Sequence, residues 1–201
     1  MRFILVLIAG LAAAGVVRAA DANDAEAAAL RKGRPYVEVR TDREGDGGVI
    51  RAASEVAAPP EVVFEVVTDC GLAPKMVTSL KSCRIVARDP AGRWDVREQV
   101  SKMTLLPSVR NVFRSEYDPP GHVHFHRVDG DLKVYDGDWW IKATDSGSLV
   151  TYESRVSTPF RVPGALARWG MRMQVPQALL ALRRECLARV QGASESNGRD
   201  P

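Results

Sequence analysis

The sequence predicts an α+β domain in which one antiparallel sheet is closed by one long C-terminal helix. The first observation is the segment from Pro163 to about Val190, which is the only stretch long and apolar enough to form a major helix. The second is the region 49–158, where apolar and polar residues alternate as in strands, apart from two short helical pieces. One helix packed on one sheet is the simplest architecture that accommodates both observations.

The C-terminal segment carries a wide apolar face. Pro163 suits the first position of a helix, because the N–H that proline lacks would have no partner within the helix. Apolar residues then recur at helical spacings and predict a broad buried surface. One stripe consists of Leu166, Trp169, Met173, Pro176, Leu180 and Leu187, and a second stripe beside it consists of Val175, Leu179, Leu182 and Cys186.

The strands are predicted from alternation. They are expected at residues 49–56, 83–87, 93–103, 109–117, 122–128, 135–143 and 148–158, with a weaker signal at 36–41 and short helices at 58–69 and 72–82. Alternation also predicts which residues face inward. They are Trp94, Val96, Glu98 and Val100 in one strand, Val109, Asn111, Phe113, Ser115 and Tyr117 in the next, and Tyr135, Gly137, Trp139 and Ile141 in a third. The connections are short, as a meander requires.

The composition is that of an ordinary globular protein, with 201 residues, 45% hydrophobic and 26% charged. A chain of this length buries a sizeable core by itself. The net charge of +3 falls to +1 without the first nineteen residues, because Arg2 and Arg18 are removed with them. The length and composition predict one domain. Since no basic stripe is present, we expect no nucleic-acid partner.

The N-terminus has the pattern of a secretory signal peptide. Arg2 is followed by an apolar run over residues 3–17 and by small residues around Ala19, which suits cleavage after that residue. An uncleaved membrane anchor is the alternative, but the apolar run is shorter than the roughly twenty residues of a spanning helix. We therefore expect residues 1–19 to be a signal peptide and the mature protein to be periplasmic or secreted.

The three cysteines matter more in an exported protein, because disulfides persist in oxidising compartments. Cys70 and Cys83 flank a short helical segment, and their spacing is compatible with a disulfide. The alternative is two small buried side chains. Cys186 lies on an apolar stripe of the last helix and is expected in the core, and no cysteine spacing resembles a zinc site.

Three segments carry a family resemblance. They are APPEVVFEVVTD at 58–69, DGDLKVYDGDWWIKATDSGSLVTYESRVSTP at 129–159 and PGALARWGMRMQVPQALLALRREC at 163–186. With the order of elements, they resemble the START-related superfamily of helix-grip proteins. Within it, the sequence looks most like the bacterial polyketide cyclase/dehydrase and lipid-transport proteins and the coenzyme-Q-binding proteins.

The resemblance implies a helix-grip fold. In that fold a curved antiparallel sheet of about six or seven strands wraps around the C-terminal helix and encloses an elongated cavity for an apolar ligand. The expected division is a signal peptide at 1–19, an N-terminal arm at 20–47, a START-like ligand-binding domain at 48–190 and a disordered tail at 191–201.

The inward residues are candidates for the lining of such a cavity. The predicted ligand-binding residues are Trp94, Glu98, Asn111, Phe113, Tyr117, Tyr135, Trp139, Tyr152, Trp169 and Met173. A mostly apolar pocket with a few polar groups is the usual form of a small-molecule site. The alternative is that these side chains fill a core. Glu98 and Asn111 either orient a ligand headgroup or lie at strand ends near solvent.

A loop between two strands is expected to control access. Met103, Leu105 and Leu106 are predicted at its tip, where exposed apolar residues need a contact or a cover. The hypothesis is that this gate loop opens the cavity or touches a membrane during ligand exchange. The alternative is a loop folded back onto the core.

Catalytic motifs are scarce in this sequence. It has no Gly-x-Ser-x-Gly elbow, P-loop, dinucleotide glycine pattern or HExxH motif, so no cofactor is expected. His122, His124 and His126 alternate along one strand and share one face. If Val123 and Phe125 face the core, the histidines face solvent; in the opposite orientation a histidine enters the cavity as a general base. No metal site is assigned to this row.

Three functions of different classes remain open at this point. The first is a carrier or sensor of a hydrophobic lipid, sterol-like or isoprenoid molecule, driven by burial of apolar surface. The second is a small cyclase/dehydratase-type enzyme in which Glu98, Tyr135 or a histidine transfers a proton. The third is a partner-binding module without a ligand. The first predicts an apolar cavity, the second an ionisable group with a shifted pKa inside it, and the third a filled core.

Overall fold

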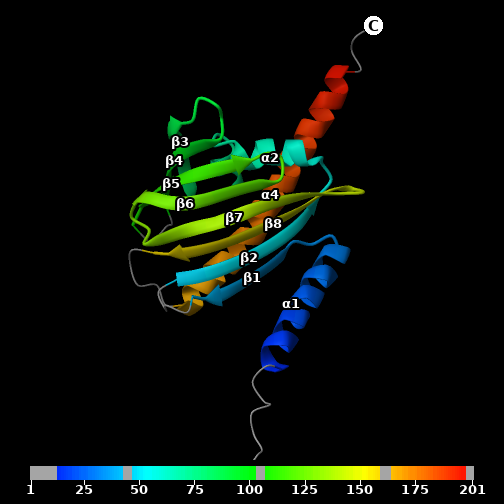
Figure 1. Ribbon diagram of the computed structural model, residues 1–201, viewed down its shortest axis with the longest axis vertical. Helices are drawn as coiled ribbons and strands as arrows, with labels where there is room; N and C mark the ends of the chain where they lie inside the picture. The colour runs from blue at the N-terminus through cyan, green and yellow to red at the C-terminus, as the bar shows by residue number, and fades with distance from the viewer. Residues whose placement is uncertain (1–12, 43–46, 103–106, 159–163, 198–201) are drawn as a thin grey trace, which may run out of the picture.

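An antiparallel sheet of eight strands curves around one long helix in the described part of the chain (Figure 1). The computed structural model describes residues 13–42, 47–102, 107–158 and 164–197. The strands are β1 (Tyr36–Thr41), β2 (Gly47–Val56), β3 (Leu80–Arg88), β4 (Trp94–Ser101), β5 (Val109–Asp118), β6 (His122–Gly130), β7 (Val134–Thr144) and β8 (Gly147–Ser157). The helices are α1 (Ala13–Arg31), α2 (Pro60–Thr68), α3 (Ala73–Met76) and α4 (Gly164–Asn197). The predicted α+β fold is confirmed, with β1 adding an eighth strand.

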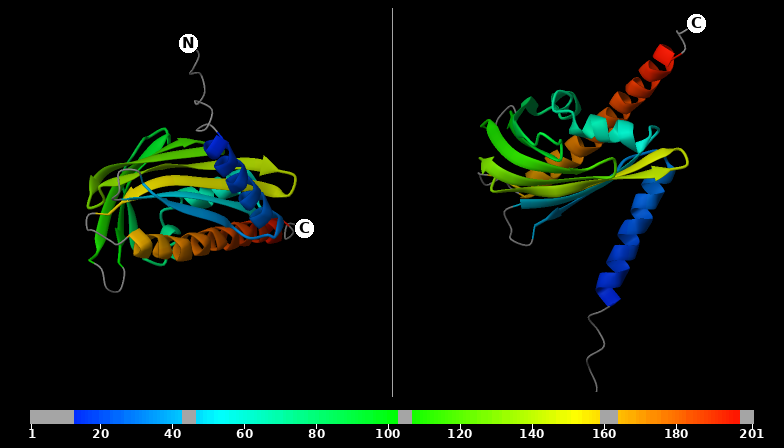
Figure 2. Two further views of the ribbon diagram at one scale, coloured as in Figure 1. Left: turned by 90° about the horizontal axis from the view of Figure 1, so that it is seen from below. Right: turned by 45° about the horizontal axis from the view of Figure 1, so that its top comes forward.

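The sheet is a meander of β3 to β8 whose last strand, β8, pairs with β2. Its spatial order is β1-β2-β8-β7-β6-β5-β4-β3, so β3 to β8 follow one another directly. β2 pairs with β8 in a register that runs from Gly47 opposite Ser157 to Val56 opposite Ser148. The connection from β2 to β3 contains α2 and α3, which cover the same side of the sheet as α4 (Figure 2).

Local chemistry explains where α2 begins and where β7 turns into β8. Pro60 lies in the first turn of α2, where the missing N–H costs no hydrogen bond. Val63 and Val66 then face the core without exposed surface. Gly147 begins β8 with φ +140°, and a Cβ there would lie 2.2 Å from the carbonyl oxygen of Val56. Only glycine therefore fits this turn.

The packed core occupies one end of the space under the sheet. It consists of Ala52, Val56, Ala58, Val63, Val66, Leu72, Ile141, Val150, Leu179, Leu182 and Cys186. These residues come from α2, α4, β2, β7 and β8 and from the loops beside α2. Cys186 has no exposed surface, as predicted, and burial raises the pKa of its thiol to about 11. The C-terminal half of α4 is thus the anchored half.

The two apolar stripes predicted for the last helix have different environments. Leu179, Leu182 and Cys186 of the second stripe are buried. In the first stripe Trp169 is 64% exposed and Met173 is 57% exposed, so the expectation that they face the cavity is wrong. Neighbouring residues of a helix point about 100° apart, so the two stripes face different directions, and the core lies on the side of the second stripe.

Several predicted boundaries also differ from the structure. The second short helix ends at Met76, and β3 begins at Leu80, because Leu80 is buried and pairs with Ser101 of β4. The N-terminal arm of 20–47 contributes β1 to the sheet, through six residue pairs with β2. The predicted tail of 191–201 is helical as far as Asn197, since α4 continues without interruption.

Cys70 and Cys83 form a disulfide with a Cα–Cα distance of 5.4 Å. It joins the loop after α2 to β3 and closes a short segment that contains α3. The gate-loop residues Met103, Leu105 and Leu106 lie outside the described residues, as do the first twelve residues of the predicted signal peptide. Among the helices that the structure describes, none combines the length and the apolar character needed to cross a membrane.

Candidate ligand-binding site

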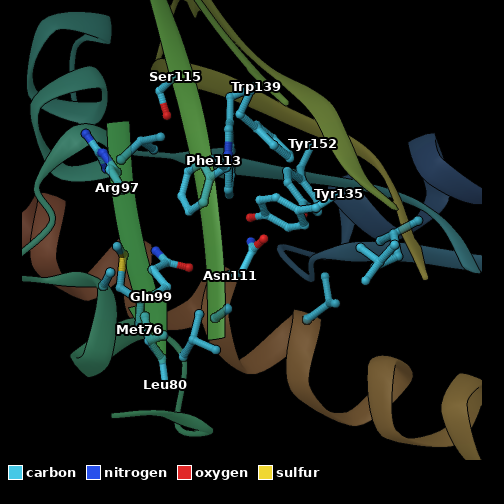
Figure 3. Close-up of a pocket in the computed structure, with 18 of the residues that line it drawn as sticks. Met76, Leu80, Arg97, Gln99, Asn111, Phe113, Ser115, Tyr135, Trp139 and Tyr152 are labelled. Carbon is cyan, nitrogen blue, oxygen red and sulfur yellow. The ribbon is translucent and has the colours of Figure 1, made fainter. Parts of the chain in front are cut away.

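A cavity of about 410 Å³ lies between the concave face of the sheet, α3 and the first half of α4 (Figure 3). Strands β4 to β8 form one wall, and Met171, Val175 and Leu179 of α4 form the opposite one. α3 contributes Ala73 and Met76. The volume falls in the range of roughly 300–1,000 Å³ that is typical of small-molecule sites.

Aromatic rings make up the middle of the strand wall. The Phe113 ring lies edge-on to Tyr135 with a centroid distance of 5.0 Å, and Trp139 packs on Tyr152 at 4.5 Å. Phe125 connects the two pairs, with its ring centroid 4.8 Å from Tyr135 and 6.0 Å from Tyr152. Because the rings contact one another, this wall has a fixed shape and offers flat apolar surfaces to a guest.

A buried ion pair marks one side of the cavity. Asp95 and Arg97 are adjacent inward positions of β4 and are only 6% and 5% exposed. Arg97 donates from Nε and Nη2 to the two Asp95 carboxylate oxygens, at 2.8 and 3.0 Å. Its Nη2 also donates to the Tyr117 hydroxyl and to the Thr68 carbonyl at the C-terminus of α2, both at 2.6 Å. A cation there is favoured by the helix dipole.

The protonation states of this cluster follow from burial and pairing. Burial alone lowers the pKa of Arg97, but the hydrogen bonds and charge of Asp95 and the neighbouring Tyr117 more than reverse that effect. Burial raises the pKa of Tyr117, and it raises that of Tyr135 well above its ordinary value. At neutral pH the guanidinium is therefore charged and both phenols are neutral.

Uncharged polar side chains complete the lining. Gln99 of β4 and Asn111 of β5 are direct cross-strand partners, and Figure 3 shows both turned toward the cavity. Ser115 lies two positions beyond Phe113 on the same inward face of β5 and is 3% exposed. These groups place hydrogen-bonding atoms among the aromatic rings.

Six of the ten predicted ligand-binding residues line this cavity. They are Asn111, Phe113, Tyr117, Tyr135, Trp139 and Tyr152. The other four, Trp94, Glu98, Trp169 and Met173, are not part of its lining. Contact of the six with a ligand stays a prediction.

The predicted inward face of β4 was wrong. Trp94 lies on the opposite face, where the guanidinium of Arg114 stacks 4.0 Å from its ring centroid. Glu98 accepts hydrogen bonds there from Arg84 at 2.8 Å and Arg110 at 2.7 Å, which hold the pKa of its carboxyl low. Ion pairing within the protein lets the polar side of this strand turn inward, and simple alternation does not detect such pairing.

The sequence analysis missed cavity residues on that polar side of β4 and near α3. Arg97, Gln99 and Ser101 of β4 line the cavity and Asp95 lies beside them, while Met76 and Leu80 close the α3 side. One signal was available: an acid and a base two positions apart share a face of a strand and can pair. One face of β4 carries mostly apolar residues and the other face carries this pair. Which face turns toward the cavity therefore depends on whether Asp95 and Arg97 pair.

The three histidines lie on the outer side of β6. Val123 and Phe125 between them are buried at 4% and 2% exposure, which settles the orientation of the strand. The His122 and His124 rings each lie within hydrogen-bond distance of the same Asp138 oxygen, at 2.8 and 3.0 Å. Within the described residues, no group of three or more histidine, cysteine or acidic side chains is arranged to hold a metal ion.

The family model of polyketide cyclase/dehydrase and lipid transport proteins matches residues 56–183, well over half of the chain. This protein therefore belongs to that family, whose START-like fold binds hydrophobic ligands in lipid transfer or polyketide cyclisation. A search of curated proteins found no significant match to the sequence.

Solved structures share the fold at low sequence identity. A STAR-related lipid transfer protein from Xanthomonas axonopodis is 17% identical, with a TM-score of 0.64, and the match covers 76% of this chain and 93% of that one. Human STARD10 is 15% identical, with a TM-score of 0.63 and coverage of 82% and 78%. The Zhui aromatase/cyclase from a Streptomyces species is 14% identical, with a TM-score of 0.55 and coverage of 71% and 93%.

Removing one member of the buried ion pair should strongly destabilise the protein. We expect Asp95→Ala to lower the free energy of unfolding by about 3–5 kcal/mol, because Arg97 is left buried without its counter-charge. Urea denaturation followed by tryptophan fluorescence measures the change. Glu116→Ala, which removes the exposed partner of Arg114, is the matched control and should cost less than about 1 kcal/mol. Equal effects of the two substitutions would contradict the assignment.

Proposed function

We propose that this protein is an exported carrier that binds one hydrophobic small molecule in the cavity between the sheet and α4. The observation that carries the proposal is the cavity itself: about 410 Å³ of space walled by aromatic and aliphatic side chains, in a member of the polyketide cyclase/dehydrase and lipid transport family. Burial of apolar ligand surface supplies the affinity. A partner-binding module with a filled core does not account for such a space.

The chemistry of the lining supports a carrier over an enzyme of the cyclase type. Of the groups predicted to transfer protons, Glu98 lies outside the lining and the histidines lie on the other face of the sheet. Tyr135 is in the cavity, but burial and the neighbouring Tyr152 raise its pKa. A general acid or base works best with a pKa near the working pH, and among the described lining residues we find no such group.

Filling the cavity should weaken ligand binding without unfolding the protein. Ala178 of α4 lines the cavity, so Ala178→Phe places a ring in the space that the ligand needs. We expect the affinity for ethylpyrene, an uncharged apolar fluorescent probe, to fall by at least about tenfold, a loss of roughly 1.4 kcal/mol. Fluorescence titration measures the binding, and thermal denaturation checks the fold.

The matched control uses the same substitution on the same helix. Ala188 is exposed on α4 and is not part of the lining, so Ala188→Phe should leave probe binding unchanged. If the probe does not bind the unaltered protein, or if both variants bind it equally well, the carrier function is wrong.

A membrane is the natural source and destination of an apolar cargo, and one surface of α4 suits contact with it. Trp169 and Met173 project one helical turn apart, 64% and 57% exposed, and Arg172 beside them is also exposed. An aromatic ring, an apolar chain and a cation together match the interface of a bilayer with anionic lipids. We propose that this surface touches the membrane during ligand exchange.

The double substitution Trp169→Ser and Met173→Ser tests the membrane contact. It should slow transfer of ethylpyrene between phosphatidylglycerol-containing vesicles by about tenfold, because two apolar side chains contribute more than roughly 1.4 kcal/mol. Equilibrium binding in solution should not change. Leu187→Ser, further along α4, is the control for a general effect of lost surface hydrophobicity. Unchanged transfer by the double variant would rule out this surface.

Export is supported by the signal-peptide pattern of residues 1–19 and by the disulfide between Cys70 and Cys83, a bond typical of oxidising compartments. We expect the protein isolated from whole cells of its own organism to begin at Ala20. Its mass should correspond to one disulfide and one free thiol at Cys186. N-terminal sequencing and intact mass measurement decide both points, and a chain that keeps Met1 and three free thiols would exclude export.

A further inference from the structure

One buried acceptor in the cavity wall lacks a partner. Asn111 is 6% exposed, and its Oδ1 makes no hydrogen bond to any described residue. Two further buried atoms share this property, Arg127 Nε and Ser154 Oγ, but neither residue lines the cavity. A buried acceptor without a donor costs free energy, and a group retained at such a cost inside a binding cavity points to a donor supplied by the ligand.

The surroundings of Asn111 favour a directed polar contact. Gln99 lies directly opposite on β4, and its Nε2 makes only a long contact of 3.7 Å with Cys83 Sγ among the described residues. In Figure 3 the two amides and the Tyr135 hydroxyl are turned toward the same part of the cavity, below the Phe113 ring. A ligand that lies on the aromatic wall therefore has one edge next to the side-chain amides of Gln99 and Asn111.

The charges of the wall cancel. Arg97 is the one ionised side chain among the described lining residues, and both carboxylate oxygens of Asp95 accept hydrogen bonds from it. Tyr117 and the Thr68 carbonyl occupy Nη2 as well. An anionic ligand would meet no unpaired cation and a cationic one no free carboxylate, so either would lose its hydration without compensation.

We propose that the cavity selects an uncharged, largely apolar molecule with a hydroxyl group, and that Asn111 accepts the hydrogen bond of this hydroxyl. Gln99 is the second contact of the same group. This inference rests on the proposed carrier function and adds to it the class of ligand: neutral alcohols and phenols, bound more tightly than hydrocarbons of the same size and than fatty acids or other anions.

Four pyrene probes test the selection. Ethylpyrene, methoxypyrene and pyrenemethanol have equal numbers of non-hydrogen atoms, and only pyrenemethanol donates a hydrogen bond; pyrenecarboxylate adds the anion. The measured quantity is the affinity for pyrenemethanol divided by that for ethylpyrene. We expect this ratio to fall about tenfold in Asn111→Leu, because ethylpyrene gains nothing from the amide and pyrenemethanol loses its acceptor.

A matched variant separates polarity from shape. Val109 lines the cavity two positions before Asn111 on β5, so Val109→Leu alters the wall without removing a polar group and should leave the ratio unchanged. Should Asn111→Leu fail to fold, the unaltered protein decides the question. It must then bind pyrenemethanol more tightly than methoxypyrene and bind pyrenecarboxylate most weakly.

Each outcome bears on one proposal. A ratio that is the same in the unaltered protein and in Asn111→Leu overturns the role of Asn111. Binding of pyrenecarboxylate as tight as that of pyrenemethanol overturns the selection for uncharged ligands. In both cases ethylpyrene still binds and the carrier function stands. Failure of all four probes to bind the unaltered protein would instead remove the carrier function itself.

Discussion

A curved sheet of eight strands presents more concave surface than one helix can cover, and the rest of this structure depends on that mismatch. α4 packs against β1, β2, α2 and α3, at one end of the sheet, where the core residues gather. α2 packs on β7, whereas β4 to β6 have no helix directly upon their concave faces (Figure 2). Apolar side chains there must contact one another, a ligand or water, and the cavity is the result.

The buried ion pair stabilises the polar side of that cavity at a cost in desolvation. Asp95 and Arg97 satisfy each other, and Arg97 also binds the last carbonyl of α2, so the pair connects the sheet to the helices above it. The same pairing neutralises the positive charge that Arg97 would otherwise offer to an anionic guest. Structural support and ligand preference therefore have a common origin in one residue.

The fold was accessible from the sequence because its signals are local and repeated. Alternation in β5 and β7 placed Phe113 and Trp139 correctly, since apolar side chains there have no alternative to the interior. It failed in β4, where Arg97 turns inward because Asp95 neutralises it. It also misplaced Trp169, because the choice between two apolar stripes of α4 depends on which side the sheet lies, and only tertiary contacts determine that. The burial of an ion pair and the rotation of a helix about its axis both depend on tertiary contacts. A pattern of apolar and polar residues along the sequence does not contain this information.

The pairing of β2 with β8 also sets an order of events during synthesis of the chain. β2 is complete at Val56, but the edge that it offers to β8 stays empty until Ser157 has been made. Almost the whole domain must be available before the sheet can close, and contacts between such distant segments form slowly. Until then, the apolar side chains of β5 to β7 lack the wall that α4 provides, since this helix is made last. Folding of this domain is therefore an event of the completed chain.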